Sequence, residues 1–227
     1  EKARQREKRR EAANCCREAV INKIAAKPAS HRARSKYIYH EFNPGSPNTI
    51  GKPTMSYDFE YLDQSLKAIT KICKKPLGIK LSPYFDFVHF EQAASVFKKY
   101  KIDYISCINS IGNALVIDPE TEQTIIRPKG GFGGLGGKYI KPTSLANVRK
   151  FYELIGDRVK LVGCGGVYTG VDAFEFILAG ASAVQLGTVF MQEGPSCFER
   201  VQDELRAIMQ RKGYTAIEDF RGKLKVV

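Results

Sequence analysis

The feature that most constrains the fold is an alternation of short apolar runs with longer segments of helical spacing. After residue 36, five runs rich in β-branched and aromatic residues are each followed by such a segment. The expected strands are 37–43, 77–81, 104–109, 160–165 and 183–188, and the expected helices lie near 56–73, 87–100, 142–155, 171–179 and 195–212. This alternation predicts an α/β fold with parallel strands and crossover helices.

One connection departs from the alternation. About 32 residues separate Asn109 from Pro142. The first part reads "LVIDPETEQTIIRP", two β-like runs around the turn signal Asp118-Pro119, which predicts a hairpin. The second part, 130–137, holds six glycines in eight positions. A long glycine-rich connection in a compact domain is typical of a lid or a binding loop.

Polar or glycine residues stand at or near the end of every expected strand. They are Asn43, Ser46 and Asn48; Lys80; Asn109, Ser110 and Asn113; Gly165 and Gly166; and Gly187 and Thr188. The carboxyl ends of parallel strands meet at one edge of the sheet, where α/β proteins bind ligands. We therefore expect one site built from all five strand ends.

The last two strand ends indicate an anion. A glycine turn before a helix exposes backbone N–H groups, and the helix dipole favours negative charge. Gly165-Gly166 precedes one expected helix, and Gly187-Thr188 precedes a short further segment. Two consecutive turns of this kind favour a phosphate site, although glycines also serve simply to make tight βα turns.

Lys80 lies within an otherwise apolar run. A buried ammonium is costly unless it has an electron-rich partner, so Lys80 is a candidate ligand-binding residue. The alternative is a lysine that reaches solvent from the strand end. The three histidines show no metal-ligand spacing, and no metal site is expected.

The charge of +12 is concentrated at the start of the chain. Residues 1–36 hold 12 Lys or Arg and 4 Asp or Glu. Ala13, Cys16, Val20 and Ile24 fall at helical spacing there, which predicts a solvated basic helix or arm, with a functional basic patch as the alternative. The expected organisation is therefore an arm, 1–36, and a domain, 37–227. The chain starts at Glu1, which is typical of a processed product or a fragment.

The compartment is predicted from what the sequence lacks. No run of about 18 apolar residues is present, so no membrane span is expected. The six cysteines form no CxxC pair and no disulfide-like framework, which favours a reduced, cytoplasmic setting.

Seven stretches together resemble the soluble, fumarate-linked dihydroorotate dehydrogenases. They are "EFNPGSPNTIGKP", "GIKLSPYFDFVHF", "CINSIGNALVID", "RPKGGFGGLGGKYIKPTSLANVR", "GCGGVYTGVDAFEFILAGA", "VQLGT" and "EGPSCFERVQDEL". The resemblance implies a (β/α)8 TIM barrel truncated to its last five β/α units, with FMN at the carboxyl ends of the strands. It also implies a homodimer that oxidises dihydroorotate to orotate with fumarate as electron acceptor. Neither membrane nor nucleic acid is expected as a partner.

The resemblance also implies residue roles. Asn43 contacts flavin and substrate, and Lys80 lies against the flavin ring. Asn48, Asn109 and Ser110 hold the orotate ring. The residues around the FMN are Asn43, Lys80, Ile108, Ser110, Gly137, Gly165, Gly166, Gly187 and Thr188, the later ones near its phosphate.

Ser46 stands where the soluble enzymes carry the cysteine that removes the substrate C5 proton. By resemblance it is the catalytic base, together with Lys80 as a catalytic residue. A hydroxyl is harder to deprotonate than a thiol of pKa about 8.5, so Ser46 needs an assisting acceptor. The membrane-associated class of these enzymes uses serine at this position. Two alternatives stay open: a non-catalytic relative that keeps part of the flavin pocket, and a scaffold or nucleic-acid-binding protein that acts through the basic arm.

Overall fold

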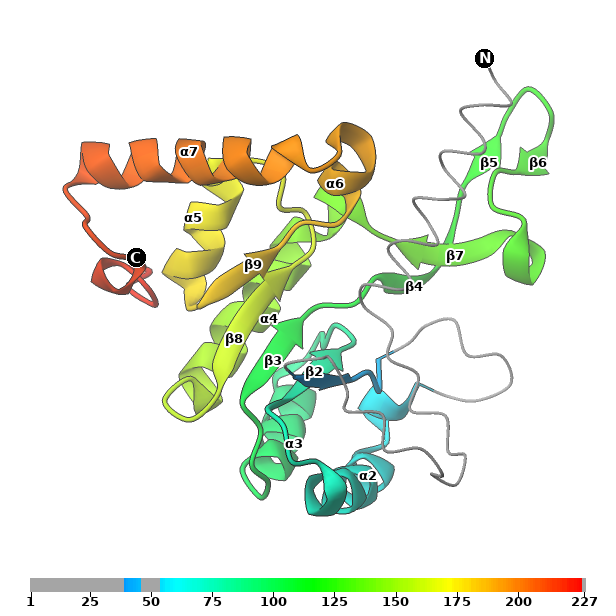
Figure 1. Ribbon diagram of the computed structural model, residues 1–227. Helices are drawn as coiled ribbons and strands as arrows, with labels where there is room; N and C mark the ends of the chain where they lie inside the picture. The colour runs from blue at the N-terminus through cyan, green and yellow to red at the C-terminus, as the bar shows by residue number, and fades with distance from the viewer. Residues whose placement is uncertain (1–38, 46–53, 226–227) are drawn as a thin grey trace, which may run out of the picture.

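The centre of the molecule is a five-stranded parallel sheet. The computed structural model describes residues 39–45 and 54–225. In spatial order the strands are β1 (His40–Phe42), β2 (Leu77–Leu81), β3 (Tyr104–Cys107), β8 (Lys160–Cys164) and β9 (Ala183–Gln185) (Figure 1). The predicted α/β class and the parallel order are confirmed. Within the described residues the sheet is open, with β1 and β9 at its edges.

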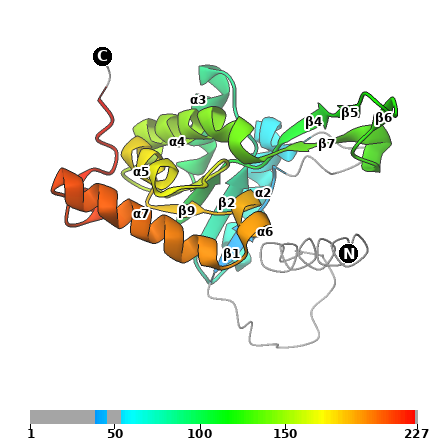
Figure 2. The ribbon, with the colours of Figure 1, turned by 90° about the horizontal axis from the view of Figure 1, so that it is seen from above.

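Helices connect the strands and cover one side of the sheet. The α-helices are α2 (Phe59–Ile72), α3 (Phe87–Phe97), α4 (Lys141–Ile155), α5 (Gly170–Ala179), α6 (Thr188–Glu193) and α7 (Ser196–Lys212). Short 3-10 turns are η1 (Met55–Tyr57), η3 (Gly137–Ile140) and η4 (Ile217–Asp219). Helices α3, α4 and α5 form a layer beside the strands, and α7 packs against α5 and α6 (Figure 2). The five predicted helices are confirmed within a few residues at each end.

Local capping explains where several helices begin. Asp58 accepts a hydrogen bond from Tyr61 N at the start of α2, and Asp86 accepts one from His89 N at the start of α3. At α5, Thr169 and Asp172 form a reciprocal capping box. Each cap satisfies a backbone donor that the helix leaves unpaired and stabilises the helix by about 1 kcal/mol.

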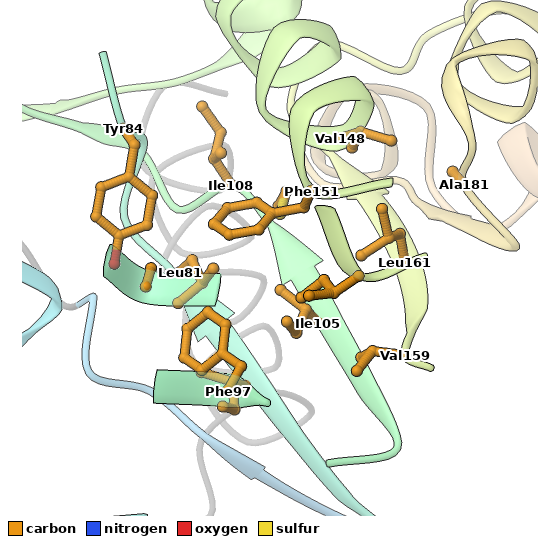
Figure 3. Packing of buried hydrophobic residues seen from close by; sticks show 14 of the residues in the cluster. Leu81, Tyr84, Phe97, Ile105, Ile108, Val148, Phe151, Val159, Leu161 and Ala181 are labelled. Atoms are coloured by element: carbon orange, nitrogen blue, oxygen red, sulfur yellow. The ribbon is translucent and has the colours of Figure 1, made fainter. Parts of the chain in front are cut away.

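The core lies between the sheet and these helices. Phe151 of α4 packs edge-on against Phe90 and Tyr84, and at a tilt against Phe97 (Figure 3). Every residue of β2 is buried. Burying an aromatic or branched apolar side chain contributes about 1.5–3 kcal/mol, which explains why this strand is apolar almost throughout.

The opposite face of the sheet is more polar. Lys80, Ser106 and Glu41 alternate with the residues that pack under the helices, and Ser106 Oγ donates to Glu41 Oε2 at 2.7 Å. The Tyr104 ring lies directly over Gly78: a Cβ on Gly78 would approach it to 2.0 Å. The glycine at this position therefore makes room for the tyrosine.

Four strands are shorter than predicted, β8 by one residue and the other three by two or more. β1 begins at His40 and ends at Phe42, because the Asn43 side chain accepts a hydrogen bond from Gly45 N and starts a turn. β3 ends at Cys107, and Asn109 N turns back to donate to Leu81 O at 2.6 Å. β9 ends at Gln185, because Thr188 already belongs to α6.

The long connection after β3 forms a hairpin arm, residues 111–135, which is a different segment from the predicted basic arm of residues 1–36. Strand β4 (Ile111–Leu115) pairs in antiparallel fashion with β7 (Phe132–Leu135), and β5 (Ile117–Asp118) pairs with β6 (Gln123–Thr124), followed by the short turn η2 (Pro128–Gly131). Figures 1 and 2 show the arm extending away from the sheet. The predicted hairpin is confirmed. The expectation of a glycine-rich loop is wrong for Phe132–Leu135, because pairing with β4 outweighs the low strand propensity of glycine.

Some predictions lie outside the described residues. They include the basic helix of residues 1–36 and the side chains of Ser46 and Asn48. Among residues 39–45 and 54–225, no helix is long and apolar enough to cross a membrane. Four cysteines of this part, Cys73, Cys107, Cys164 and Cys197, are free thiols.

Candidate active site

A cavity of about 160 Å³ opens at the carboxyl ends of the strands. Nine residues expected from the sequence line it: Lys80, Ile108, Asn109, Ser110, Gly137, Gly165, Gly166, Gly187 and Thr188. They come from segments as far apart in sequence as β2 and α6. The expected convergence of the strand ends is therefore present for four of the five strands.

The end of the remaining strand, β1, joins the site through a side-chain contact. Asn109 Nδ2 donates to Asn43 Oδ1 at 3.2 Å, and Ser110 N donates to Asn109 Oδ1 at 3.0 Å. Asn43 Oδ1 also accepts from Gly45 N at 3.2 Å. The two asparagines are thus fixed relative to each other beside the cavity. Amide groups held in this way can donate to and accept from a planar ring with carbonyl and N–H edges.

The turn after Asn43 is docked on the end of β2. Ser82 Oγ donates to Gly45 O at 3.2 Å, and a Cβ on Gly45 would approach Ser82 N to 2.4 Å. Ser56 N donates to Pro44 O at 3.2 Å. These contacts fix the backbone immediately before Ser46.

Lys80 is buried, with 7% of its surface exposed. Its Nζ donates to Gln185 Oε1 at 3.1 Å, and both side chains line the cavity. The alternative of a lysine that reaches solvent is therefore wrong. Sequence reasoning predicted an electron-rich partner but missed Gln185, although a polar residue in the apolar run "AVQLGT" was a usable signal.

The glycines at the strand ends have distinct reasons to be glycine. Gly165 and Gly166 have φ values of +123° and +81°, in the region that side chains disfavour. A Cβ on Gly166 would also approach Lys141 Cβ to 2.6 Å. Gly187 has φ −112°, and a Cβ there would meet no atom within 4 Å. The fold itself therefore does not require glycine at 187, and the open space beside it fits a bound group.

The N-terminus of α5 differs from the expectation. Asp172 Oδ2 accepts hydrogen bonds from Tyr168 N and Thr169 N, and Glu204 Oε2 accepts from Gly170 N at 2.6 Å. The chain's own carboxylates therefore occupy the place expected for an anion. An anion at this edge is left with the backbone of the glycine turns and with Thr188.

A salt bridge fixes the Asp172 carboxylate. Lys141 contacts both Asp172 and Glu175. Burial alone would raise the pKa of Asp172, but hydrogen bonds from Lys141, Tyr168 N and Thr169 outweigh burial and lower the pKa below its usual value. The ionised form is therefore the stable one in the folded protein.

Ser144 is a second residue that sequence reasoning missed. It is fully buried in α4, and its Oγ lies 2.7 Å from Cys164 O and 3.3 Å from Cys107 O. The contact joins the ends of β3 and β8 below the cavity.

The nearby Cys107 thiol has a pKa raised to about 12, because burial outweighs the opposing effect of Lys80, so it stays protonated and is no candidate base.

Another cavity, of about 350 Å³, lies at the other end of the sheet. It is lined by the basic residues Lys98, Lys99, Lys101 and Arg158 and by the apolar residues Phe97, Ile102, Ile155 and Val159. None of the predicted site residues whose positions the structure describes lies there. Asn113 also lies away from the site, on β4 of the arm.

A parallel sheet with helices on one side and a candidate site at its carboxyl edge is typical of proteins of the (β/α)-barrel class. The profile of the family described as "Dihydroorotate dehydrogenase" matches residues 19–209. The chain therefore belongs to the dihydroorotate dehydrogenase family.

Known relatives agree with this assignment. The dihydroorotate dehydrogenase (fumarate) of Kluyveromyces lactis is 53% identical over 187 residues, which is 82% of this chain and 59% of the relative. A Streptococcus pyogenes serotype M3 protein assigned as dihydroorotate dehydrogenase A (fumarate) is 57% identical, again over 82% of this chain and 59% of the relative. The ligand-free DHODH of Eimeria tenella superposes with a TM-score of 0.67 at 26% identity, over 82% of this chain and 55% of that one.

The match is partial on the side of the relatives. The chain spans about 59% of the length of the curated relatives named above. The five parallel strands found among residues 39–45 and 54–225 agree with the predicted partial barrel, since a complete barrel has eight.

Proposed function

We propose that the chain carries the flavin- and substrate-binding part of a fumarate-type dihydroorotate dehydrogenase, which oxidises dihydroorotate to orotate in the cytoplasm. The supporting observation is the convergence of Lys80, Asn109, Ser110 and the glycine turns on one cavity. An enzyme of this type uses fumarate as its electron acceptor.

The cavity residues fit one side of an FMN. The open space beside Gly187 and Thr188 suits a phosphate, and the buried Lys80 ammonium suits the electron-rich edge of a flavin ring. The volume of about 160 Å³ is below the 300–1,000 Å³ of usual ligand pockets, in agreement with a chain that contributes part of the pocket. FMN, when bound, supplies a hydride acceptor.

The chain's own residues perform the remaining tasks. Asn43, Asn48, Asn109 and Ser110 bind and orient the substrate ring, with Asn43 also facing the flavin. Ile108 and Gly137 complete the flavin side of the pocket, while Gly165, Gly166, Gly187 and Thr188 hold the phosphate. Ser46, which follows Gly45 in the sequence, takes the C5 proton of dihydroorotate and passes it to an assisting acceptor.

Flavin binding and turnover are tested separately. FMN is titrated into the purified chain, and flavin fluorescence is followed against riboflavin, which lacks the phosphate. We expect FMN to bind more tightly, and dihydroorotate to bleach the bound flavin under anaerobic conditions. A well-folded protein that ignores FMN contradicts the proposal. Binding without bleaching favours the non-catalytic alternative, which the partial length of the chain makes a specific second candidate.

We further propose a homodimer formed through the hairpin arm, residues 111–135. The arm exposes the large apolar residues Leu115, Val116, Ile117, Ile125 and Phe132, and clusters of this kind are typical of protein interfaces. Ile117→Glu should convert the dimer to a monomer in analytical ultracentrifugation. Ile72→Glu, at an exposed isoleucine of α2, is the matched control and should leave the dimer intact. A monomeric parent protein contradicts this assembly.

A further inference from the structure

Lys80 and Gln185 are in contact although their strands are not neighbours. Lys80 lies on β2 and Gln185 on β9, with β3 and β8 between them. Nζ nevertheless lies 3.1 Å from Oε1, so the pair spans β3 and β8. Lys80 alternates along β2 with Ile79 and Leu81, which belong to the core, so it lies on the opposite face of the sheet. Both side chains line the same cavity. The position of the ammonium is therefore set by a residue from the far edge of the sheet.

The partner of the ammonium carries no charge. A lysine ammonium has three donors, and Gln185 Oε1 accepts one of them. None of the ion pairs among residues 39–45 and 54–225 involves Lys80. A glutamine thus holds the ammonium in place without neutralising it, whereas a glutamate would cancel its charge.

From this geometry, and given the proposed flavin function, we infer that Gln185 is a positioning residue for the flavin reaction. It holds Lys80 at the cavity while keeping the full positive charge of Lys80 available to the flavin. A fixed positive charge in a buried site stabilises the negative charge that the flavin gains on reduction. The neutral amide at position 185 therefore favours the reduced flavin.

Two substitutions separate position from charge. Gln185→Glu keeps the length and the acceptor but adds a negative charge, and Gln185→Met keeps the length but removes the acceptor. The matched controls are Gln64→Glu and Gln64→Met, at an exposed glutamine of α2 whose amide bonds to Glu60. A variant that fails to fold is replaced by Gln185→Asn, which keeps the amide but is too short to reach Nζ.

The first readout needs no flavin. The ¹³C NMR signal of Lys80 is recorded after reductive methylation of the flavin-free protein, with Lys80→Arg used to assign it. Gln185→Glu should shift this signal, because a carboxylate replaces the neutral amide beside Nζ. A signal identical to that of the parent in both Gln185 variants overturns the contact itself.

The second readout is the flavin midpoint potential. In Gln185→Glu the affinity for reduced relative to oxidised FMN should fall by about tenfold or more. In Gln185→Met the rate of flavin reduction at saturating dihydroorotate should fall by about tenfold with little change in KM, because the ammonium is no longer held. Bound flavin with parent-like potential and rate in both variants overturns this inference alone. A chain that binds no FMN overturns the proposed function as well.

Discussion

Asn147 holds the main chain of Tyr84 at two points. Tyr84 N donates to Asn147 Oδ1 at 2.8 Å, and Asn147 Nδ2 donates to Tyr84 O at 3.0 Å. Asn147 is 1% exposed, so no water can replace its side chain without rearrangement. The contact connects α4 to the segment after β2, next to the Tyr84–Phe151 ring pair.

Replacing Asn147 by alanine should therefore be costly. It leaves a donor and an acceptor of Tyr84 unpaired inside the protein, and each loss costs about 1–3 kcal/mol. We expect Asn147→Ala to lower the free energy of unfolding by about 2–4 kcal/mol in urea titrations. Gln64→Ala is the exposed helical control and should change it by less than about 0.5 kcal/mol. Equal effects of the two substitutions would contradict the assigned contact.

Gly78 and Tyr104 should behave as a coupled pair. Alanine at 78 places a Cβ inside the space of the Tyr104 ring, so overpacking should cost about 1–3 kcal/mol. In the Tyr104→Ala background the same Gly78→Ala substitution should cost much less, because the ring is gone. A double-mutant cycle by thermal or urea unfolding measures this coupling. Additive effects would show that the ring does not cover Gly78.

The Asp172 carboxylate should make stability depend on pH. Its folded-state pKa lies below the usual value, so its contribution is complete above the unfolded pKa and is lost as the pH falls through the folded value. Asp172→Asn should therefore lower the free energy of unfolding by about 1–2 kcal/mol at pH 7. The difference from the parent should shrink below about pH 4.

The control for this effect is Asp203→Asn. Asp203 pairs with Arg206 on the exposed face of α7, where ion pairs contribute little. Unfolding of parent and both variants is measured in urea at pH 7 and pH 3. A constant penalty of Asp172→Asn at both pH values would refute the assigned role of the charge.

Gly187 and Gly165 should respond differently to alanine. Gly187→Ala meets no atom and keeps an allowed backbone, so stability should change by less than about 0.5 kcal/mol. Its methyl group enters the open space assigned to the phosphate, and FMN affinity should fall at least about tenfold, while riboflavin affinity should change less. Gly165→Ala, at φ +123°, should instead lower stability by about 1 kcal/mol or more. FMN affinity unchanged in Gly187→Ala would move the phosphate elsewhere.

Ser46 should control the rate of proton removal. Ser46→Ala should slow flavin reduction by dihydroorotate about tenfold to a thousandfold with FMN content unchanged. Ser46→Cys should speed it by a similar factor near neutral pH, since a thiol has a usable thiolate fraction there. Stopped-flow bleaching of the flavin measures both. If Ser46→Ala reduces flavin as fast as the parent, the base lies elsewhere.

The sheet was largely predictable because its signal is local. The apolar run 77–81 corresponds to β2 residue for residue, since every residue of this strand is buried. The buried position of Lys80 was also predictable, because its charge stands out within that run. Its pairing with Gln185 was not, although the polar residue stands out in its own apolar run, since the contact joins positions 105 residues apart and depends on how the sheet brings β2 and β9 together.

Other departures arise where tertiary contacts outweigh local preference. The glycine-rich segment contains β7 because β4 supplies a pairing partner, which no local propensity encodes. The glycine turn before α5 predicted an anion site. In the structure the carboxylates of Asp172 and Glu204 accept hydrogen bonds from the backbone at this helix N-terminus, and Glu204 lies on α7, far away in the sequence. The side chains of Ser46 and Asn48 remain predictions from sequence.

The lysine-rich cavity at the far end of the sheet makes the distribution of charge over the described residues uneven. The segments that lead into β2, β3 and β8 (71–76, 98–103 and 156–160) carry eight basic and two acidic residues, a net +6, whereas all described residues together carry 23 and 20, a net +3. The remainder of the described residues is therefore net negative, so within this part of the chain positive charge is concentrated at the ends where β2, β3 and β8 begin. On a cation-exchange matrix the described domain should adsorb by its lysine-rich end, with the carboxyl ends of the strands facing the solvent.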